Sequence, residues 1–205
     1  MSQATKRKII SAAETLFASH GFTHTSMRMI TRQAGVNLSA VNYHFGSKKN
    51  LIQAVLKYYF DIVSPQIDEQ LALLQSANNV SVEDVIQCII IPLNSIEEHR
   101  SNGTARFVQL LGRGYSESQG HLRSFILGHY GQTMSGLMHQ FKRSVPNVDA
   151  EELFWRLHFA LGSFVFSMAS SEALMDIAEA DFKATTHIQS ITEKLARFVT
   201  AGISG

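Results

Sequence analysis

Polar and basic side chains suited to recognising a charged polymer gather between residues 25 and 49 of this sequence. Arg28 can donate to two acceptors at once, Asn42 presents a donor beside an acceptor, and Lys48 carries a compact positive charge. Arginine and asparagine side chains pair with the edges of guanine and adenine, while a lysine ammonium contacts backbone phosphates. These residue types therefore predict contacts with nucleic acid.

The candidate residues divide by the part of DNA that each side chain suits. Hydroxyls, rings and ammonium groups suit phosphates, and the N–H groups at a helix start add a positive dipole end. The predicted phosphate-binding residues are Thr25, Ser26, Tyr43, His44 and Lys48. The predicted base-reading residues are Arg28, Ser39, Ala40 and Asn42, with Tyr43 able to serve either role. For each residue alone, the competing interpretation is a solvated surface side chain.

Two short helices joined by a tight turn are expected to position these side chains. A hydroxyl of Thr25 or Ser26 can cap the first helix, Gly35 suits the left-handed residue that ends it, and Asn37 can cap the second. This layout is typical of a DNA-binding helix-turn-helix, whose second helix reads the major groove. An ordinary helical hairpin would give the same local pattern.

The second of these helices has a predicted inward face. Leu38, Val41 and Phe45 recur at intervals of three and four residues, so we expect them to point into a core. The same geometry predicts that the polar residues between them, together with Ala40, point outward.

Charge is divided unevenly along the chain. Residues 1–50 hold seven Lys and Arg against the single acid Glu14, a net charge of +6, and the remainder holds eleven basic and sixteen acidic residues, a net charge of −5. A basic segment on an acidic remainder favours a polyanionic partner. A basic tail that only aids solubility would explain Lys6 to Lys8 but not the basic residues from Arg28 to Lys49.

Composition favours an all-α, cytoplasmic protein. The 205 residues are 45% hydrophobic and contain only three prolines, and long stretches follow a period of 3.6 residues. The one cysteine, Cys88, has no partner for an intramolecular disulfide, which suits a reducing compartment. We see no signal peptide, and no apolar run approaches the roughly 20 residues that a membrane-spanning helix needs.

Catalysis and metal binding are not expected. None of the nine histidines falls in a His-Glu-x-x-His pattern, and no Gly-x-x-x-x-Gly-Lys phosphate loop is present. The Gly-Tyr-Ser-Glu-Ser run at Gly114 to Ser118 follows no predicted strand, so it is not a nucleophile elbow. We therefore predict no catalytic residue, no metal and no cofactor.

The first fifty residues resemble the N-terminal domain of TetR-family transcriptional regulators. The matching runs are Ala12-Ala13-Glu14, Leu16-Phe17, Gly21-Phe22, Thr25-Ser26, Ala34-Gly35-Val36, Val41-Asn42-Tyr43-His44-Phe45 and Ser47-Lys48. The resemblance implies a helix-turn-helix DNA-binding domain over residues 1–47 and a helical ligand-binding and dimerisation domain over residues 48–205. It also implies a homodimer that binds a near-palindromic operator as a repressor.

The remaining periodic stretches predict helices throughout the chain. A first helix spans 4–20, and a connecting helix begins at Lys48 and kinks or restarts at Ser64-Pro65. Ser81 and Asp84 resemble a capping box at the start of the next helix, in which Pro92 is a break or kink. Later helices are expected at 104–115, 121–145, 150–170, 172–179 and 188–202.

The predicted helix at 150–170 is apolar almost all round, so it must be covered on more than one side. A second subunit would cover the side that its own core does not, and in TetR-like proteins the last two long helices form the dimer interface. The predicted interface residues are Leu153, Phe154, Leu157, Leu161, Phe164, Leu195 and Phe198.

A ligand cavity between the central helices is a further expectation. Its predicted lining is Phe107, Leu111, Tyr115, Phe125, Tyr130, Met134, Trp155, His158 and Phe159, although each could be plain core. Three stretches, at 106–112, 116–123 and 152–159, are similar to PsrA-type regulators, a branch associated with fatty-acid or acyl effectors.

That similarity implies a fatty acid or acyl-CoA as the effector, with a head group that could meet Arg123, Arg156, His121, His158 or Gln119. A core or interface ion pair is the alternative for Arg156. An aromatic or cationic drug is the alternative effector, and a helical protein without DNA binding is the alternative function.

Overall fold

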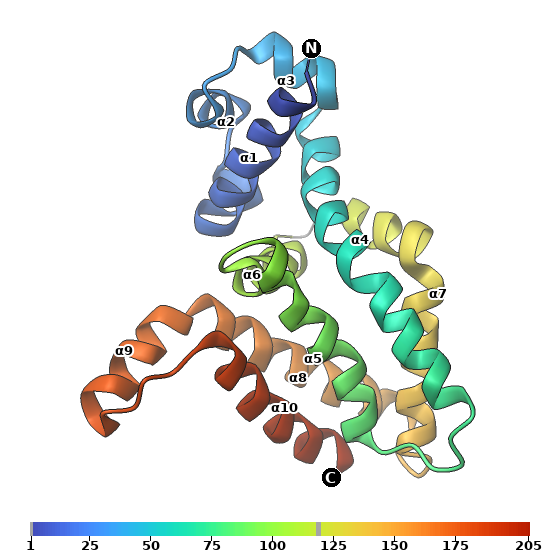
Figure 1. Ribbon diagram of the computed structural model, residues 1–205. Helices are drawn as coiled ribbons and strands as arrows, with labels where there is room; N and C mark the ends of the chain where they lie inside the picture. Colours follow the sequence, from blue (N-terminus) through green and yellow to red (C-terminus); the bar gives the residue numbers. More distant parts are fainter. Residues whose placement is uncertain (1, 118–119) are drawn as a thin grey trace.

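The computed structural model describes residues 2–117 and 120–205, which form ten α-helices and no strand within these ranges. Three helices make a small N-terminal unit, here called the head (α1–α3), and seven make a larger unit, the body (α4–α10). Figure 1 shows the head at one end of the molecule, with α4 running from it along the body. The all-helical architecture predicted from the sequence is confirmed.

The head consists of α1 (Gln3–His24), α2 (Met27–Ala34) and α3 (Leu38–Phe45). Its helices pack around fully buried apolar side chains, among them Phe17, Phe22, Ile30 and Val41. Within α1 the helical geometry is interrupted at Gly21, whose φ of 80° lies in the left-handed region that glycine adopts without steric cost. This break agrees with the predicted end of the first regular helix.

The connecting helix α4 (Lys48–Gln75) joins the two units. Its first turns pack against α1 and α3, and it also contacts α5 and α7 in the body. The helix continues through Pro65, so of the kink or restart predicted at Ser64-Pro65 the restart is wrong. Proline lacks an N–H, so the helix loses one backbone hydrogen bond. The free energy gained by burying the apolar side chains of α4 between Leu51 and Leu71 outweighs that loss.

The middle of the body contains α5 (Val82–His99), α6 (Gly103–Ser116) and α7 (Gly120–Ser144). The predicted capping box is confirmed, since the Ser81 hydroxyl accepts from the Asp84 N–H and the Asp84 side chain accepts from the Ser81 N–H. Pro92 lies inside a continuous α5. A feature not predicted is the non-helical backbone at Tyr130, which interrupts α7.

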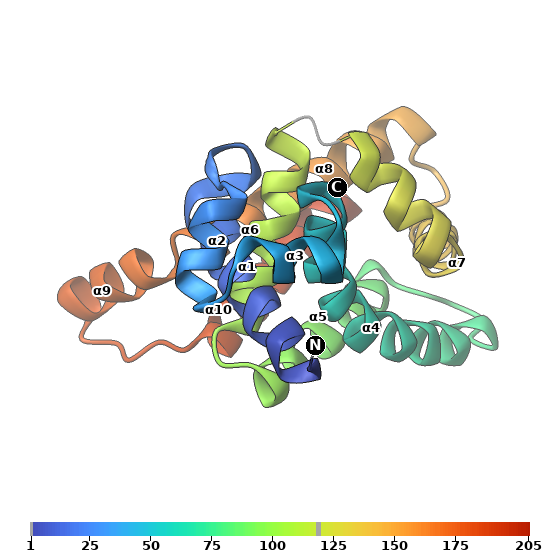
Figure 2. The ribbon, with the colours of Figure 1, turned by 90° about the horizontal axis from the view of Figure 1, so that it is seen from above.

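The C-terminal part of the body contains α8 (Ala150–Ala169), α9 (Ser171–Phe182) and α10 (Ile188–Ser204). Asp149 caps α8, as predicted, by accepting from the Glu152 N–H. Helices α8 and α10 pack against each other, whereas α9 extends away from the body in both views (Figures 1 and 2).

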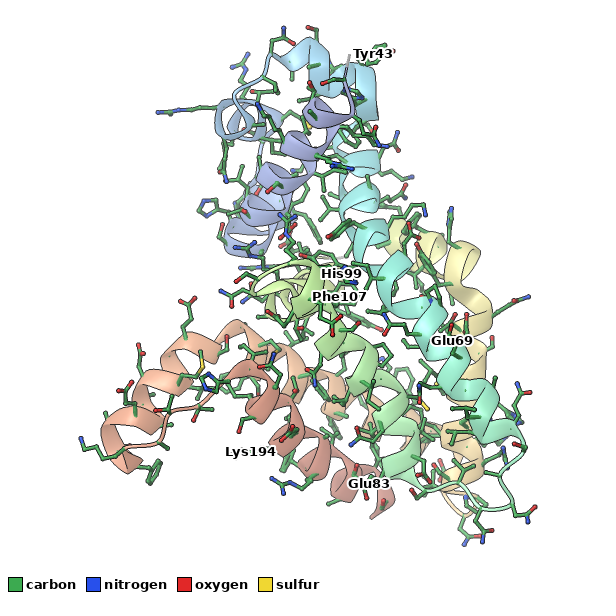
Figure 3. All side chains as sticks on the ribbon, in the orientation of Figure 1. Tyr43, Glu69, Glu83, His99, Phe107 and Lys194 are labelled. Carbon is green, nitrogen blue, oxygen red and sulfur yellow. The ribbon has the colours of Figure 1, made fainter. Side chains whose placement is uncertain are left out.

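One hydrophobic core runs through head and body. It extends from Ile9 in α1 to Ile203 in α10 without a gap between the units. Phe107 lies near the centre of the molecule (Figure 3) and stacks on Tyr59 with ring centroids 5.0 Å apart. No helix in the described ranges is long and apolar enough to cross a membrane.

Candidate DNA-binding face and effector sites

Side-chain caps fix the geometry of the helix-turn-helix. The Ser26 hydroxyl accepts from the Met29 N–H at the start of α2, and Asn37 Oδ1 accepts from the Ala40 N–H at the start of α3. Gly35 ends α2 with φ 63° and ψ 38°, the left-handed conformation predicted for it. These local bonds fix where α2 begins and ends and where α3 begins.

The exposed face of this unit carries most of the predicted DNA-contacting residues. Ser26, which caps α2, and Arg28 on α2 are exposed, as are Ser39, Asn42 and Tyr43 on α3. Tyr43 is 71% exposed and lies at the end of the head far from the body (Figure 3). Of these five, Ser39 also donates to Asn37 Oδ1, at 2.8 Å. We call these five residues the reading face.

Thr25 does not point outward, which corrects its predicted role as a phosphate ligand. Its hydroxyl is fully buried and donates to the carbonyls of Leu16, at 3.1 Å, and Gly21, at 2.7 Å. The break at Gly21 leaves carbonyls at the end of α1 without a helical donor, and Thr25 satisfies them. The hydroxyl therefore closes α1, while Ser26 alone caps α2.

The inward face of α3 also differs from the expectation. Ala40 is buried and Leu38 is 43% exposed, the reverse of the prediction. Burial centres on Ala40 and Val41, which places Leu38 at the edge of the face, and an eight-residue helix has too few turns for periodicity to fix its orientation. Ala40 cannot reach a base in this arrangement, whereas Leu38 lies beside the reading face.

His44 and Lys48 are partly buried at the margin of the reading face. The Nε2 atom of His44 is buried and has no hydrogen-bond partner among the described residues. The Lys48 ammonium donates to the carbonyl of Thr23 at 3.4 Å, so it lies beside the end of α1. Both side chains sit near the turns that flank α2 and α3 rather than on the outer surface of α3.

The only acid of the first fifty residues, Glu14, is completely buried and faces the body. Arg100 binds both carboxylate oxygens, at 2.8 and 2.7 Å, and Arg106 binds one of them at 3.2 Å. Residues 2–50, all of which the structure describes, therefore expose no acidic side chain. The surface of the head is uniformly neutral or basic.

The ion pairs of Glu14 join head and body. Arg100 precedes α6 and Arg106 lies on it, while Glu14 lies on α1. The Tyr59 hydroxyl is buried beside this cluster, and burial followed by the nearby Glu14 carboxylate raises the pKa of Tyr59 above its usual range. We call Glu14, Arg100 and Arg106 the ionic joint. Sequence reasoning missed it, although a lone acid in a basic segment was a visible signal.

A second contact between head and body is made by Glu117, at the end of α6. Its carboxylate accepts from the N–H groups of Phe22, at 3.1 Å, and Thr23, at 2.6 Å. Burial alone would raise the pKa of Glu117, but these hydrogen bonds and the charge of Arg113 outweigh it and hold the pKa below its usual range. Any side chain at Gly21 would collide with this carboxylate.

The predicted ligand-lining residues do not enclose one cavity. Phe107 and Tyr130 are buried in the core, where Tyr130 stacks on Phe60 with centroids 4.7 Å apart. Leu111, Phe125 and Met134 are partly buried and pack against that core. For Phe107, plain core is the interpretation that the structure supports, whereas Tyr130 also borders a cleft between α4 and α7.

Tyr115, Trp155 and Phe159 are exposed, so their predicted place inside a cavity of one subunit is wrong. Trp155 stacks on Phe159 on the outer side of α8, and His158 lies against Phe154 on the same helix. Because α8 is apolar almost all round, the sequence could not indicate which side faces its own core.

Met134 contributes to an apolar groove instead of an internal cavity. The groove has a volume of about 460 Å³ and lies between α7 and the start of α8. Leu127, Met138 and Leu153 form most of its apolar wall, and Lys142 adds a positive charge.

The predicted head-group residues are scattered. Arg156 binds Glu152 at 2.7 Å and the carbonyl of Ile203 at 2.8 Å, so it joins α8 to α10. This agrees with the alternative prediction for Arg156, an ion pair in the core or interface. Arg123 is exposed on α7. Burial, and then the charge of Lys49, lowers the pKa of His121. Gln119 lies outside the described residues.

The predicted dimer residues fall into two groups. Leu153 and Leu195 are buried within the protomer, so they are core residues here. Phe154 and Phe198 are exposed on α8 and α10, and Leu157, Leu161 and Phe164 are partly buried. The exposed sides of these packed helices leave a large aromatic surface in contact with solvent.

Residues 2–117 and 120–205 contain no group of three or more His, Cys, Asp or Glu side chains placed to hold a metal ion. Cys88 is buried, and burial followed by the charge of Asp84 raises the pKa of its thiol above the usual value. A raised pKa disfavours the reactive thiolate.

Family models match both parts of the chain. The model described as "Bacterial regulatory proteins, tetR family" matches residues 9–55. The model described as "Tetracyclin repressor-like, C-terminal domain" matches residues 87–202, more than half of the chain.

Curated relatives are similar over part of their length. The chain is 30% identical to the probable HTH-type transcriptional regulator YttP of Bacillus subtilis over 112 residues, which cover 53% of this chain and 50% of YttP. It is 30% identical over 93 residues to IcaR of Staphylococcus aureus, the negative transcriptional regulator of the biofilm operon, which cover 45% of this chain and 48% of IcaR. The chain thus spans about half the length of the curated relatives it matches.

Solved structures share the fold along the whole chain. A TetR transcriptional regulator from Legionella pneumophila superposes with a TM-score of 0.56 at 17% identity, covering 98% of this chain and 97% of that one. SmeT, the repressor of a Stenotrophomonas maltophilia multidrug efflux pump, superposes with a TM-score of 0.55 at 20% identity, covering 97% of this chain and 89% of SmeT. At these identities the likeness shows the fold alone.

Proposed function

Because the chain belongs to the TetR family of bacterial regulatory proteins, we propose that it is a dimeric DNA-binding repressor released by a small effector. The observation that carries the proposal is the uniformly non-acidic surface of the head, on which the reading face projects from two capped helices. The negative regulator IcaR, a relative by sequence, supports repression as the direction of control.

DNA contacts are assigned to residues whose side chains are exposed or partly exposed. Arg28, Ser39 and Asn42 read bases in the major groove, with Tyr43 reaching a base or a phosphate. Phosphate contacts come from Ser26, His44 and Lys48, together with the N–H groups at the start of α2. Thr25 and Ala40 take no part because their side chains are buried.

A salt titration of DNA binding tests this proposal. Each neutralised phosphate contributes about −0.9 to the slope of log affinity against log salt on duplex DNA. Two heads with several phosphate contacts each are expected to give a slope steeper than about −4. Binding with a slope near zero, or no binding to duplex DNA of any sequence, would contradict the proposal.

Dimerisation is proposed through the exposed sides of α8 and α10. The exposed rings of Phe154 and Phe198 lie on these two helices, and a second subunit would remove them from water. We propose a domain boundary at residue 47. Residues 1–47 contact DNA, and residues 48–205 contain the dimer interface and the effector sites. Two heads held in this way bind half-sites about 34–36 Å apart, or a multiple of that distance.

The effector proposed first is a long-chain fatty acid or its acyl derivative. The groove between α7 and α8 supports it, since Met134 and Met138 are adaptable apolar side chains and Lys142 can pair with a carboxylate. Oleate added to the protein–DNA complex is expected to release the DNA, and Lys142→Gln to weaken that release more than Lys194→Gln on α10. If oleate released DNA equally from both variants, Lys142 would not be part of the effector site.

A cationic effector is the second candidate, because a cleft of about 680 Å³ between α4 and α7 contains two carboxylates. Asp61 and Asp68 line it beside Tyr130, whose hydroxyl donates to Asp61 at 2.8 Å. An aromatic ring next to a carboxylate suits an organic ammonium ion. Release of DNA by benzyltrimethylammonium but not by oleate would favour this candidate, provided that Asp68→Asn abolishes the effect.

A further inference from the structure

A cleft of about 630 Å³ lies where the head meets the body, between α1, α6 and α8. Thr15 and Ser19 line it from α1, and Val165 and Ala169 line it from α8. The wall formed by α6 carries two guanidinium groups, those of Arg106 and Arg113. The cleft is separate from the reading face and from the groove between α7 and α8, so it is not part of the sites assigned above.

Arg106 and Arg113 both line the cleft, and each has N–H donors beyond those used in its own contacts. Their spacing of seven residues is two helical turns, which places both side chains on one side of α6. Arg106 donates to Glu14 at 3.2 Å, and Arg113 donates to the Ser19 carbonyl at 3.4 Å. A guanidinium has five N–H donors, so these contacts leave most of them available.

The charge around the cleft is positive. Among the described residues that line it, none is acidic. Glu14 and Glu117 lie nearby, but Glu14 is engaged by Arg100 and Arg106, and Glu117 by the N–H groups of Phe22 and Thr23. An anion in the cleft would therefore contact two guanidinium groups. The nearby carboxylates of Glu14 and Glu117 are already engaged by other groups.

The opposite wall is apolar. Helices α6 and α8 approach closely at Gly112, where a side chain would collide with Val165. Val165 and Ala169 line the cleft from α8 and can receive the non-polar part of a ligand. The combination of paired guanidinium groups and a short apolar wall matches a small organic anion.

We propose that this cleft is a second ligand site, which binds a small organic carboxylate between head and body. The carboxylate is held by Arg106 and Arg113, and its short alkyl chain lies on Val165 and Ala169. The same two arginines contact α1 through Glu14 and the Ser19 carbonyl. A ligand in the site would therefore use free donors of the same two side chains that fasten the head to the body.

Calorimetric titration of the full-length protein with hexanoate and with neutral hexanamide tests the site without DNA. Loss of one charge-assisted pair is expected to weaken binding by about tenfold or more. We expect hexanamide to bind at least tenfold more weakly than hexanoate, and inorganic phosphate to bind more weakly than hexanoate because it lacks the alkyl chain.

Three variants locate the binding. Arg113→Gln and the cleft-filling Ala169→Leu are each expected to weaken hexanoate binding at least tenfold, whereas Arg7→Gln, which removes the same charge from an exposed position on α1, leaves it unchanged. Thermal unfolding confirms that each variant folds. The proposal is overturned if wild-type protein binds no hexanoate, or if hexanamide or phosphate binds as tightly as hexanoate. It is also overturned if Arg113→Gln and Arg7→Gln have the same affinity for hexanoate.

Discussion

Replacing Glu14 with Gln should strongly destabilise the protein, because the ionic joint then loses its only negative charge. The carboxylate is fully buried; its Oε1 atom accepts from Arg100 at 2.8 Å and from Arg106 at 3.2 Å, and its Oε2 atom forms an ion pair with Arg100 at 2.7 Å. Glutamine keeps the volume and one acceptor but leaves two guanidinium groups without a counter-charge. A surface glutamate in the same position would contribute little.

The magnitude follows from the burial of the three side chains. Removing one partner of a buried ion pair costs about 3–5 kcal/mol. The side chains of Arg100 and Arg106 remain 22% and 34% exposed and can regain water, so we expect the lower end, about 3 kcal/mol. For a chain of this length that corresponds to a fall in melting temperature of roughly 6–12 °C.

Urea unfolding at equal protein concentration measures this loss, because the proposed dimerisation would make stability depend on concentration. The control is Glu69→Gln, an exposed residue on α4 (Figure 3), which should change the free energy of unfolding by less than about 0.5 kcal/mol. Combining Glu14→Gln with Arg100→Gln should cost less than the sum of the two single changes. A loss below about 1 kcal/mol for Glu14→Gln, or additive effects in the double variant, would refute the role of the joint.

Three further outcomes follow from the assigned contacts. Lys48→Ala should weaken binding to all DNA sequences and flatten the salt dependence by about one unit, and an unchanged slope would exclude a phosphate contact. Phe198→Glu should give monomers in sedimentation velocity, whereas Phe182→Glu on the projecting α9 should remain dimeric; two dimers would place the interface elsewhere. The lowered pKa of Glu117 stabilises the fold at neutral pH, and this contribution is lost as pH falls through that pKa. The stability difference between wild type and Glu117→Gln should therefore shrink below about pH 4, and a constant difference would contradict the contact.

Local signals predicted most of the fold. Asn37, Ser81 and Asp149 cap the helices that the sequence assigned to them, since a cap depends only on residues within one turn. The break in α7 at Tyr130 was missed, because no proline marks it and glycines on either side are tolerated in a helix.

Side-chain orientation was less predictable wherever it depends on distant segments. Whether Thr25 closes α1 or opens α2 is decided by the backbone at Gly21. The exposure of Trp155 depends on which side of an apolar helix meets its own core. The pairing of Glu14 with Arg100 joins residues 86 positions apart, beyond the reach of helical periodicity.

Selection of binding sites from a random duplex pool would show whether α3 reads DNA through its exposed polar side chains. Wild-type protein should enrich a near-palindromic site whose half-sites are related by the dimer axis. Asn42→Ala should lose preference at one base pair in each half-site, by about 1–3 kcal/mol, while preferences at other positions persist. Enrichment of no motif by wild-type protein, or an identical motif from Asn42→Ala, would contradict the account.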